Sequence, residues 1–222
     1  MRFLKNIFAG SPAVSRVAPF VIFLVLTFCQ GKFGADSACW FYFGKTLAGA
    51  WLIWEMRPFV PEMRWAISWE AIVVGVGIFA LWVGIDPFYP KIFHAGATGN
   101  PNEQSGENSV LAWFFIAAHV FGMTLVVPPL EEVFYRSFLY RYLAKQDFQS
   151  VPLNQFSPWP FLATALFFGF SHNEWLAGIL CGAAYQWLVL RKNRLGDAMT
   201  AHAITNFLLG VWIVWQGAWN FW

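Results

Sequence analysis

The chain has 222 residues, of which 58% are hydrophobic, 20% aromatic and only 12% charged, and its formal net charge is +2. A soluble domain carries roughly 25% charged residues, so this chain has too few to cover a water-facing surface. The composition therefore predicts one integral membrane domain over residues 1–222, with no separate soluble module. No basic run of the kind that binds nucleic acid occurs in the sequence.

Seven apolar runs follow one another along the chain and approach the ~20 residues that a helix needs to cross a bilayer. Polar or turn-forming residues separate these runs, and a loop rich in such residues extends from 95 to 109. We therefore expect an all-α, polytopic transmembrane bundle of about seven or eight helices. The runs fall at residues 17–35, 38–56, 66–86, 109–127, 158–172, 174–190 and 198–217, and the fifth is short.

Basic residues flank the runs unevenly, and this bias predicts the orientation in the membrane. If seven spans alternate, four basic clusters share one side, which places the N-terminus in the cytoplasm. The loop over 86–109 holds only Lys91 as a basic residue, as expected for the outer side. The four clusters are Arg2, Lys5 and Arg16; Arg57 and Arg64; Arg136, Arg141 and Lys145; and Arg191, Lys192 and Arg194.

Two adjacent carboxylates and an arginine directly follow the fourth run. Ionisable groups at membrane depth are costly, so they indicate function by default. Glu132 and Arg136 are four residues apart and share a helix face, with the glutamate first, which favours an ion pair. Glu131 lies about 100° around the helix axis from Glu132. We expect the pair to hold the helix and Glu131 to face a cavity.

Two further pairs of polar or aromatic residues occur at the same spacing of four. Phe168 precedes His172, and His202 precedes Asn206. A carboxylate beside a neutral imidazole can polarise water into a nucleophile, and a second histidine with an amide can stabilise an oxyanion. The sequence thus contains the groups needed for amide hydrolysis without a nucleophilic side chain, whereas Ser171 lacks a nucleophile-elbow context.

The simple alternation of spans conflicts with joint action of these groups. It places Glu131 and His202 near the inner ends of their spans but His172 near the outer end of its span. A break in the fourth span at Pro128-Pro129, tolerated at depth where it lines a wet cavity, would remove the conflict. We therefore expect a broken or re-entrant helix near Pro128-Pro129 and a segment over 158–172 that does not fully cross the membrane.

The three motifs read EExxxR at Glu131 to Arg136, FxxxH at Phe168 to His172 and HxxxN at His202 to Asn206. In this order they resemble the CPBP family of intramembrane proteases, which includes type II CAAX prenyl endopeptidases, bacterial Abi-type proteins and a CAAX protease-related subgroup. The motifs predict a catalytic core over residues 106–222. Residues 1–105 form N-terminal spans without a recognisable motif.

The resemblance implies an intramembrane endopeptidase, located in a prokaryotic plasma membrane, that cleaves a peptide or a CAAX-like or lipidated protein. It implies that Glu131 and His172 activate water and that His202 and Asn206 stabilise the oxyanion. Glu132, Arg136 and Phe168 are then supporting motif residues. We favour catalysis without a metal ion, but Glu131, His172 and His202 are also a possible His₂Glu zinc site with one open position.

Two other classes of function use the same polar residues. A non-catalytic membrane protein, such as a peptide-binding or bacteriocin-immunity protein, would keep the pocket without cleaving anything. A small transporter would use the buried charges as an ion relay, but the sequence has no repeated halves to support this interpretation.

Overall fold

The structure is a computed structural model that describes residues 2–30, 32–34, 37–92 and 100–222, with side chains described from Asn6 onward. Over these residues it contains helices and no strand, which confirms the predicted all-helical class. Part of the predicted outer loop, residues 93–99, lies outside the described residues. The main helices outside the long central segment are α1 Arg2–Gly10, α2 Pro12–Cys29, α3 Ala38–Met56, α4 Trp69–Ile85, α5 Pro101–Ser105, α9 Pro158–Phe170, α10 Trp175–Lys192 and α11 Gly196–Gln216.

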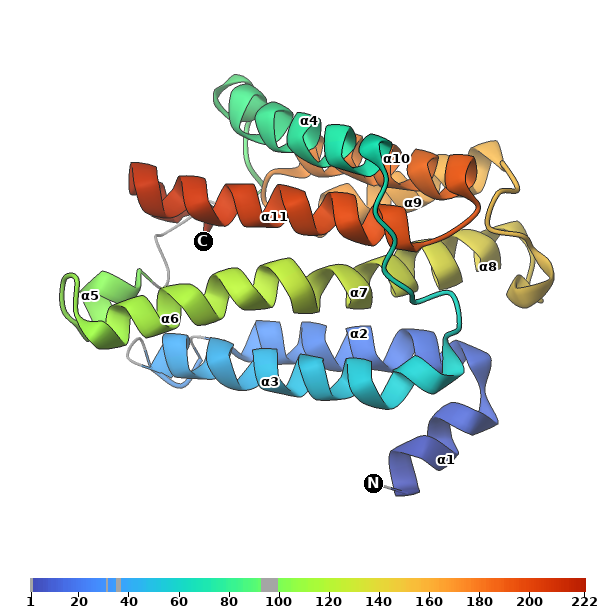
Figure 1. Cartoon of the computed structure of the whole chain (residues 1–222), viewed down its shortest axis with the longest axis horizontal. Coiled ribbons are helices and arrows are strands. Elements are labelled where there is room, and N and C mark those ends of the chain that lie inside the picture. The colour runs from blue at the N-terminus through green and yellow to red at the C-terminus, as the bar shows by residue number, and fades with distance from the viewer. Residues whose placement is uncertain (1, 31, 35–36, 93–99) are drawn as a thin grey trace.

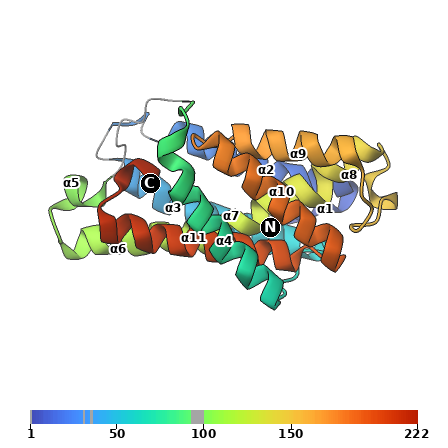
Figure 2. The same ribbon diagram turned by 90° about the horizontal axis from the view of Figure 1, so that it is seen from above.

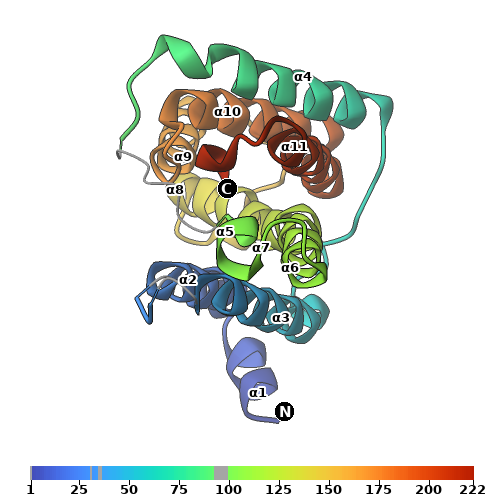
Figure 3. The same cartoon turned by 90° about the vertical axis from the view of Figure 1, so that its left-hand side faces the viewer.

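The helices form layers (Figure 3), in which the α2/α3 pair packs beneath the long central segment. On the other side of that segment lie α9, α10 and α11. Helix α4 forms the outermost layer and runs obliquely across α10 and α11 (Figure 2). Residues far apart in the sequence therefore meet between the long segment and α11.

Four helices are long and apolar enough to cross a membrane, counted over the described residues: α2, the segment Trp69–Phe88, the segment Val110–Ala144 and α11. Large apolar side chains such as Trp54, Trp69 and Trp215 are exposed on the outside of the bundle. A soluble protein rarely leaves extended apolar surface in water, so this surface faces lipid. The chain is an integral membrane protein.

The start of α2 differs from the first apolar run, which was expected from residue 17. The helix begins at Pro12, because Ser11 accepts a hydrogen bond from the backbone N–H of Val14 at 3.3 Å and caps it. Proline at the first helical position suits this start, since its missing N–H would have no partner there. The run predicts the helix, and the cap sets its beginning.

The long central segment corrects the expectation of a broken or re-entrant helix at Pro128-Pro129. It stays helical over the 35 residues Val110–Ala144 (Figure 1). Its parts are α6 Val110–Phe121, the π-helical turn η4 Gly122–Val126, α7 Val127–Glu132, the second π-helical turn η5 Val133–Leu139 and α8 Tyr140–Ala144.

The first π-helical turn explains how the segment passes the prolines. Pro128 and Pro129 have no N–H and their rings crowd the preceding turn of an α-helix. In η4 the chain is wider, and the backbone N–H of Val127 bonds to the carbonyl of Gly122, five residues back. Local π geometry of this kind accommodates proline in a membrane helix. The two prolines therefore do disturb the α-helix, as expected, but the result is a locally widened helix rather than a break.

The short helix α9 supports the other part of that expectation, that the segment over 158–172 does not fully cross the membrane. This helix has 13 residues, which at 1.5 Å per residue is about 20 Å, shorter than the ~30 Å of a bilayer core. It ends at Phe170, and α10 then packs back against it. His172 consequently does not lie a full bilayer away from Glu131.

Candidate active site

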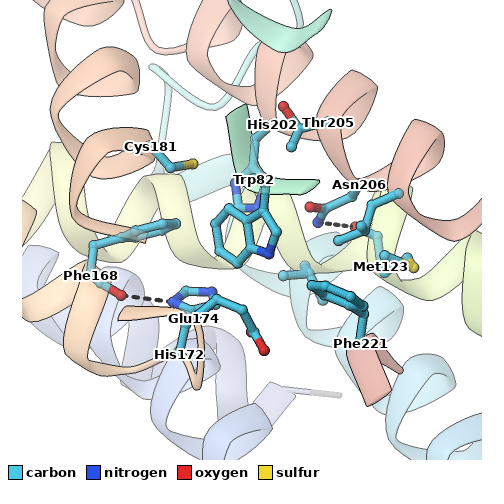
Figure 4. A pocket seen from close by; sticks show the side chains of 12 residues that line it. Trp82, Met123, Phe168, His172, Glu174, Cys181, His202, Thr205, Asn206 and Phe221 are labelled. Carbon is cyan, nitrogen blue, oxygen red and sulfur yellow. Dashed lines mark hydrogen bonds between the residues drawn. The ribbon is translucent and has the colours of Figure 1, made fainter. Parts of the chain in front are cut away.

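A cavity of about 170 Å³ lies where the long segment, α9, α10, α11 and α4 meet (Figure 4). Three of the four residues predicted to be catalytic line it: His172, His202 and Asn206. The motif residue Phe168 lines it as well. The other lining residues are Trp82, Met123, Val127, Glu174, Cys181, Thr205, Leu209 and Phe221.

His172 is held by the residue that begins its own motif. The ring Nδ1 lies 2.7 Å from the backbone carbonyl oxygen of Phe168, one turn back (Figure 4). Carbonyls in the last turn of a helix lack intrahelical partners, and α9 ends at Phe170. Because a carbonyl only accepts, Nδ1 carries the proton and Nε2 keeps its lone pair. The spacing of FxxxH thus fixes which nitrogen can act as a base.

Two residues that we did not predict as functional support this arrangement. The hydroxyl of Tyr135 donates to Ser171 Oγ at 3.2 Å, and Ser171 Oγ donates to the Phe168 carbonyl at 2.7 Å. Ser171 Oγ also lies 3.1 Å from His172 Nδ1. Tyr135 follows Glu131 by four residues and so lies on the same helix face. This spacing is the feature of the sequence that could have identified Tyr135 as part of the site.

Glu132 makes two contacts where we expected one. The predicted ion pair is present, with Glu132 Oε2 3.2 Å from Arg136 Nε, and both side chains are fully buried. Glu132 Oε1 also accepts a hydrogen bond from His202 Nδ1 at 2.9 Å. The first motif therefore orients the histidine of the third motif, a role that spacing alone did not reveal.

Arg136 and the rings around it connect all three motifs. Its Cζ lies 4.4 Å from the centre of the Phe168 ring, and its Nη2 donates to the carbonyl of Gly182 at 3.3 Å. Tyr185, another residue that the sequence did not single out, stacks on the His202 ring at 5.1 Å. A buried guanidinium between a carboxylate and an aromatic face is held in one position.

Asn206 is tied to the first π-helical turn. Its Nδ2 donates to the carbonyl of Met123 at 2.7 Å (Figure 4). An amide nitrogen carries two hydrogens, so one N–H is left for a ligand in the cavity. The widened turn before the prolines thus also serves as a support for the third motif.

Glu131 is the predicted residue that does not line the cavity. Its Oε2 lies 4.0 Å from His202 Nε2, and its side chain is 16% exposed. The same oxygen has no hydrogen-bond partner. Glu131 therefore lies next to the site with one buried oxygen unpaired, and no hydrogen bond joins it to His172 in the described part of the chain.

The residue set that we considered for zinc does not fit a metal site as these side chains lie. Over residues 2–30, 32–34, 37–92 and 100–222, no three His, Cys, Asp or Glu side chains are close enough to hold a metal ion. A tetrahedral zinc site needs ligand atoms about 2.0–2.2 Å from the ion. Glu131, His172 and His202 would have to rearrange before they could bind one.

Comparison with known proteins bears on the same stretch of chain. The family model for Rce1-like type II CAAX prenyl endopeptidases matches residues 105–208, which contain all three motifs. No curated protein and no solved structure matches the chain. The resemblance seen in the motifs is therefore confirmed over residues 105–208, where the chain is similar to the Rce1-like type II CAAX prenyl endopeptidase family.

Proposed function

We propose that this protein is an intramembrane endopeptidase that hydrolyses a peptide bond of a membrane-associated protein. The observation that carries the proposal is the shared cavity: His172 from one motif and His202 and Asn206 from another line it. The family match supports a protease in general terms. The residue roles that follow are those that the motif resemblance implies, combined with the positions of the side chains.

In the proposed reaction Glu131 and His172 together activate one water molecule: His172 Nε2 orients it, Glu131 accepts its proton, and the water oxygen attacks the peptide carbonyl carbon. Glu131 is available for this role, because its buried Oε2 has no hydrogen-bond partner among the described residues. The proton then moves to the peptide nitrogen as the C–N bond breaks. General acid–base transfer of this kind contributes roughly 10²–10⁴-fold to a rate.

His202 and Asn206 are proposed to hold the negative oxygen of the tetrahedral intermediate. Asn206 has a free N–H, since only one of its two amide hydrogens is used by Met123. For His202 the donor is Nε2, because Nδ1 already donates to Glu132, so the imidazolium is the acting form. Donors aimed at a developing oxyanion typically contribute about 10²–10³ in rate.

The first test replaces the proposed water activators. Glu131→Gln and His172→Ala in proteoliposomes should each lower cleavage of a membrane-delivered peptide by roughly 10²-fold or more, because the proton acceptor or the group that orients the water is lost. Cleavage is measured by mass spectrometry of the products. Glu107→Gln, which changes an exposed carboxylate, is the matched control and should cleave normally.

Full activity in either variant would refute the assigned roles. If the wild-type protein cleaves nothing while the variants keep the biological effect, the alternative of a non-catalytic peptide-binding or immunity protein holds instead. Comparing the same peptide with and without a prenyl group tests the narrower proposal of a CAAX-like or lipidated substrate.

The second test concerns the metal ion. We expect activity to survive extensive chelation, because the proposed chemistry uses only side chains of the chain itself. Residual metal is quantified by plasma mass spectrometry alongside the peptide assay. Loss of activity on chelation with recovery on adding zinc would replace this mechanism with the zinc-dependent one.

A further inference from the structure

A second cavity, of about 500 Å³, lies near the other half of the chain, between α2, α3, α6 and the C-terminal end. Figure 3 shows α2 and α3 side by side, on the far side of the long segment from α4. We propose that this cavity binds a phosphate-type anion, and that the natural source of the anion is the headgroup of an anionic phospholipid. The residues that line it are Thr27, Gln30, Lys32, Ala38, Tyr42, Lys45, His119 and Trp222.

The central observation is a buried cation, the ammonium group of Lys45. Lys45 is 6% exposed, and in the described part of the chain no carboxylate lies within ion-pair distance of its Nζ. Taking an ammonium group out of water costs several kcal/mol even after relaxation. Buried charges are therefore normally paired.

The contacts that Lys45 does make offset only part of this cost. Its Nζ bonds to Thr27 Oγ1 at 3.1 Å, which uses one of the three ammonium donors. It also lies 4.5 Å from the Tyr42 ring centre and 5.3 Å from the Phe23 ring centre. A cation over an aromatic face gains about 0.5–2 kcal/mol. The other two donors of Lys45 have no hydrogen-bond acceptor among the described residues, and Lys45 lines a cavity that has room for one.

The lining of the cavity indicates a negatively charged ligand. Two of the eight lining residues, Lys45 and Lys32, are cationic, and none of those eight is acidic. His119 contributes a ring stacked between Tyr42 at 3.7 Å and Trp222 at 3.9 Å, which fixes one wall. A phosphate oxygen on Lys45 makes a charge-assisted hydrogen bond of the strong kind.

The surroundings favour a lipid headgroup as the source of the phosphate. Phe28, Phe33 and Trp40, close to the lining residues in the sequence, are 69%, 71% and 55% exposed. Aromatic side chains gather at the level of the lipid headgroups. A phospholipid at this level can place its acyl chains along the apolar outer surface and its phosphate in the cavity.

The test measures lipid binding to the purified full-length chain in a neutral detergent. Native mass spectrometry counts bound phosphatidylglycerol, and a melting curve records the change in Tm when it is added. We expect Lys45→Met to weaken phosphatidylglycerol binding at least tenfold and to abolish the rise in Tm, whereas Lys45→Arg keeps both. Lys145→Met, which removes an exposed lysine at the opposite end of the bundle, should bind like the wild-type chain.

Three comparisons keep the proposal open to refutation. Equal binding by wild type and Lys45→Met would overturn it, as would equal binding of phosphatidylglycerol and zwitterionic phosphatidylcholine. If inorganic phosphate alone raises Tm as much as the lipid does, the anion site stands but the lipid source is wrong. If the Lys45→Met chain fails to fold, the Lys45→Arg chain is tested instead. Its binding of phosphatidylglycerol is then compared with its binding of phosphatidylcholine, and equal binding of the two lipids would overturn the proposal.

Discussion

At the scale of single residues, the motif spacings predicted partners within a helix better than partners across helices. The Glu132–Arg136 pair and the one-turn relation of Phe168 to His172 follow from a spacing of four, and both are observed. The contact of Glu132 with His202 joins residues 70 positions apart. Such a contact depends on how helices pack, and no local pattern in the sequence encodes it.

Tyr135 is the residue whose role the structure adds most clearly. Tyr135→Phe removes the hydroxyl that donates to Ser171, which in turn lies against the His172 ring nitrogen. We expect kcat to fall by about tenfold, the cost of one hydrogen bond of about 1.4 kcal/mol, while KM for the peptide changes little. The pH profile of kcat should shift as well, because the His172 environment changes.

A merely structural role for Tyr135 predicts something different. In that case Tyr135→Phe lowers Tm without moving the pH profile. Tyr142→Phe, on an exposed position of the same long segment, is the matched control for loss of a tyrosine hydroxyl.

At the scale of elements, the apolar runs predicted the helices well, and their ends less well. Six of the seven runs begin within three residues of an observed helix, whereas the first was placed five residues late because Ser11 and Pro12 cap α2. The fourth run was taken to end before Pro128. A π-helical turn lets the helix continue, and the sequence offers no simple signal for that geometry.

The close crossing of α9 and α10 gives a test at this scale. A Cβ added at Gly178 would lie 2.9 Å from the Cα of Gly169 and 3.2 Å from its carbonyl oxygen. Gly178→Ala must push the two helices apart, and overpacking of this kind costs typically 1–3 kcal/mol. We expect a lower Tm and reduced peptide cleavage, because His172 follows α9 directly.

Gly77→Ala is the matched control for this change. Gly77 lies in α4 with nothing within 4 Å of an added Cβ, so its replacement should leave Tm and activity unchanged or raise Tm slightly. Equal melting of the two variants would show that the α9–α10 crossing is not constrained as described.

At the scale of the whole molecule, a buried polar cluster joins the N-terminal helices to the motif-bearing half. Glu62, in the connection between α3 and α4, accepts hydrogen bonds from Arg16 Nη2 at 2.7 Å and Arg16 Nε at 2.9 Å. Ser137, in the second π-helical turn, donates to the same carboxylate. Arg141 lies 3.6 Å from it. The sequence did not predict this cluster, because its members come from three distant segments.

This cluster predicts how stability depends on pH. Burial alone would raise the pKa of Glu62, but the charge of Arg16 and the hydrogen bond from Ser137 outweigh it, so the pKa is lowered. A lowered folded-state pKa adds stability above the unfolded value of about 4.3 and loses it as pH falls through the folded value. Glu62→Gln should lower Tm at pH 7, with a cost of roughly 2 kcal/mol.

The difference in Tm between Glu62→Gln and wild type should shrink as the pH falls below about 4, since the wild-type carboxyl then becomes neutral too. Asp147→Asn, at an exposed position, serves as the control and should follow the wild-type curve. A difference in Tm that stays constant from pH 7 to pH 3 would contradict the charge-based account.

The shortness of α9 also has a consequence for the lipid around the protein. Its outer face carries Trp159, Leu162, Phe167 and Phe170, all more than half exposed, so this flank touches acyl chains directly. A hydrophobic helix that is shorter than the hydrocarbon core of the bilayer causes the bilayer to thin locally, at a cost of fractions of a kcal/mol per Å of hydrophobic mismatch. A polypeptide that approaches His172 along this flank would therefore cross a thinner hydrocarbon layer than a full-length helix imposes.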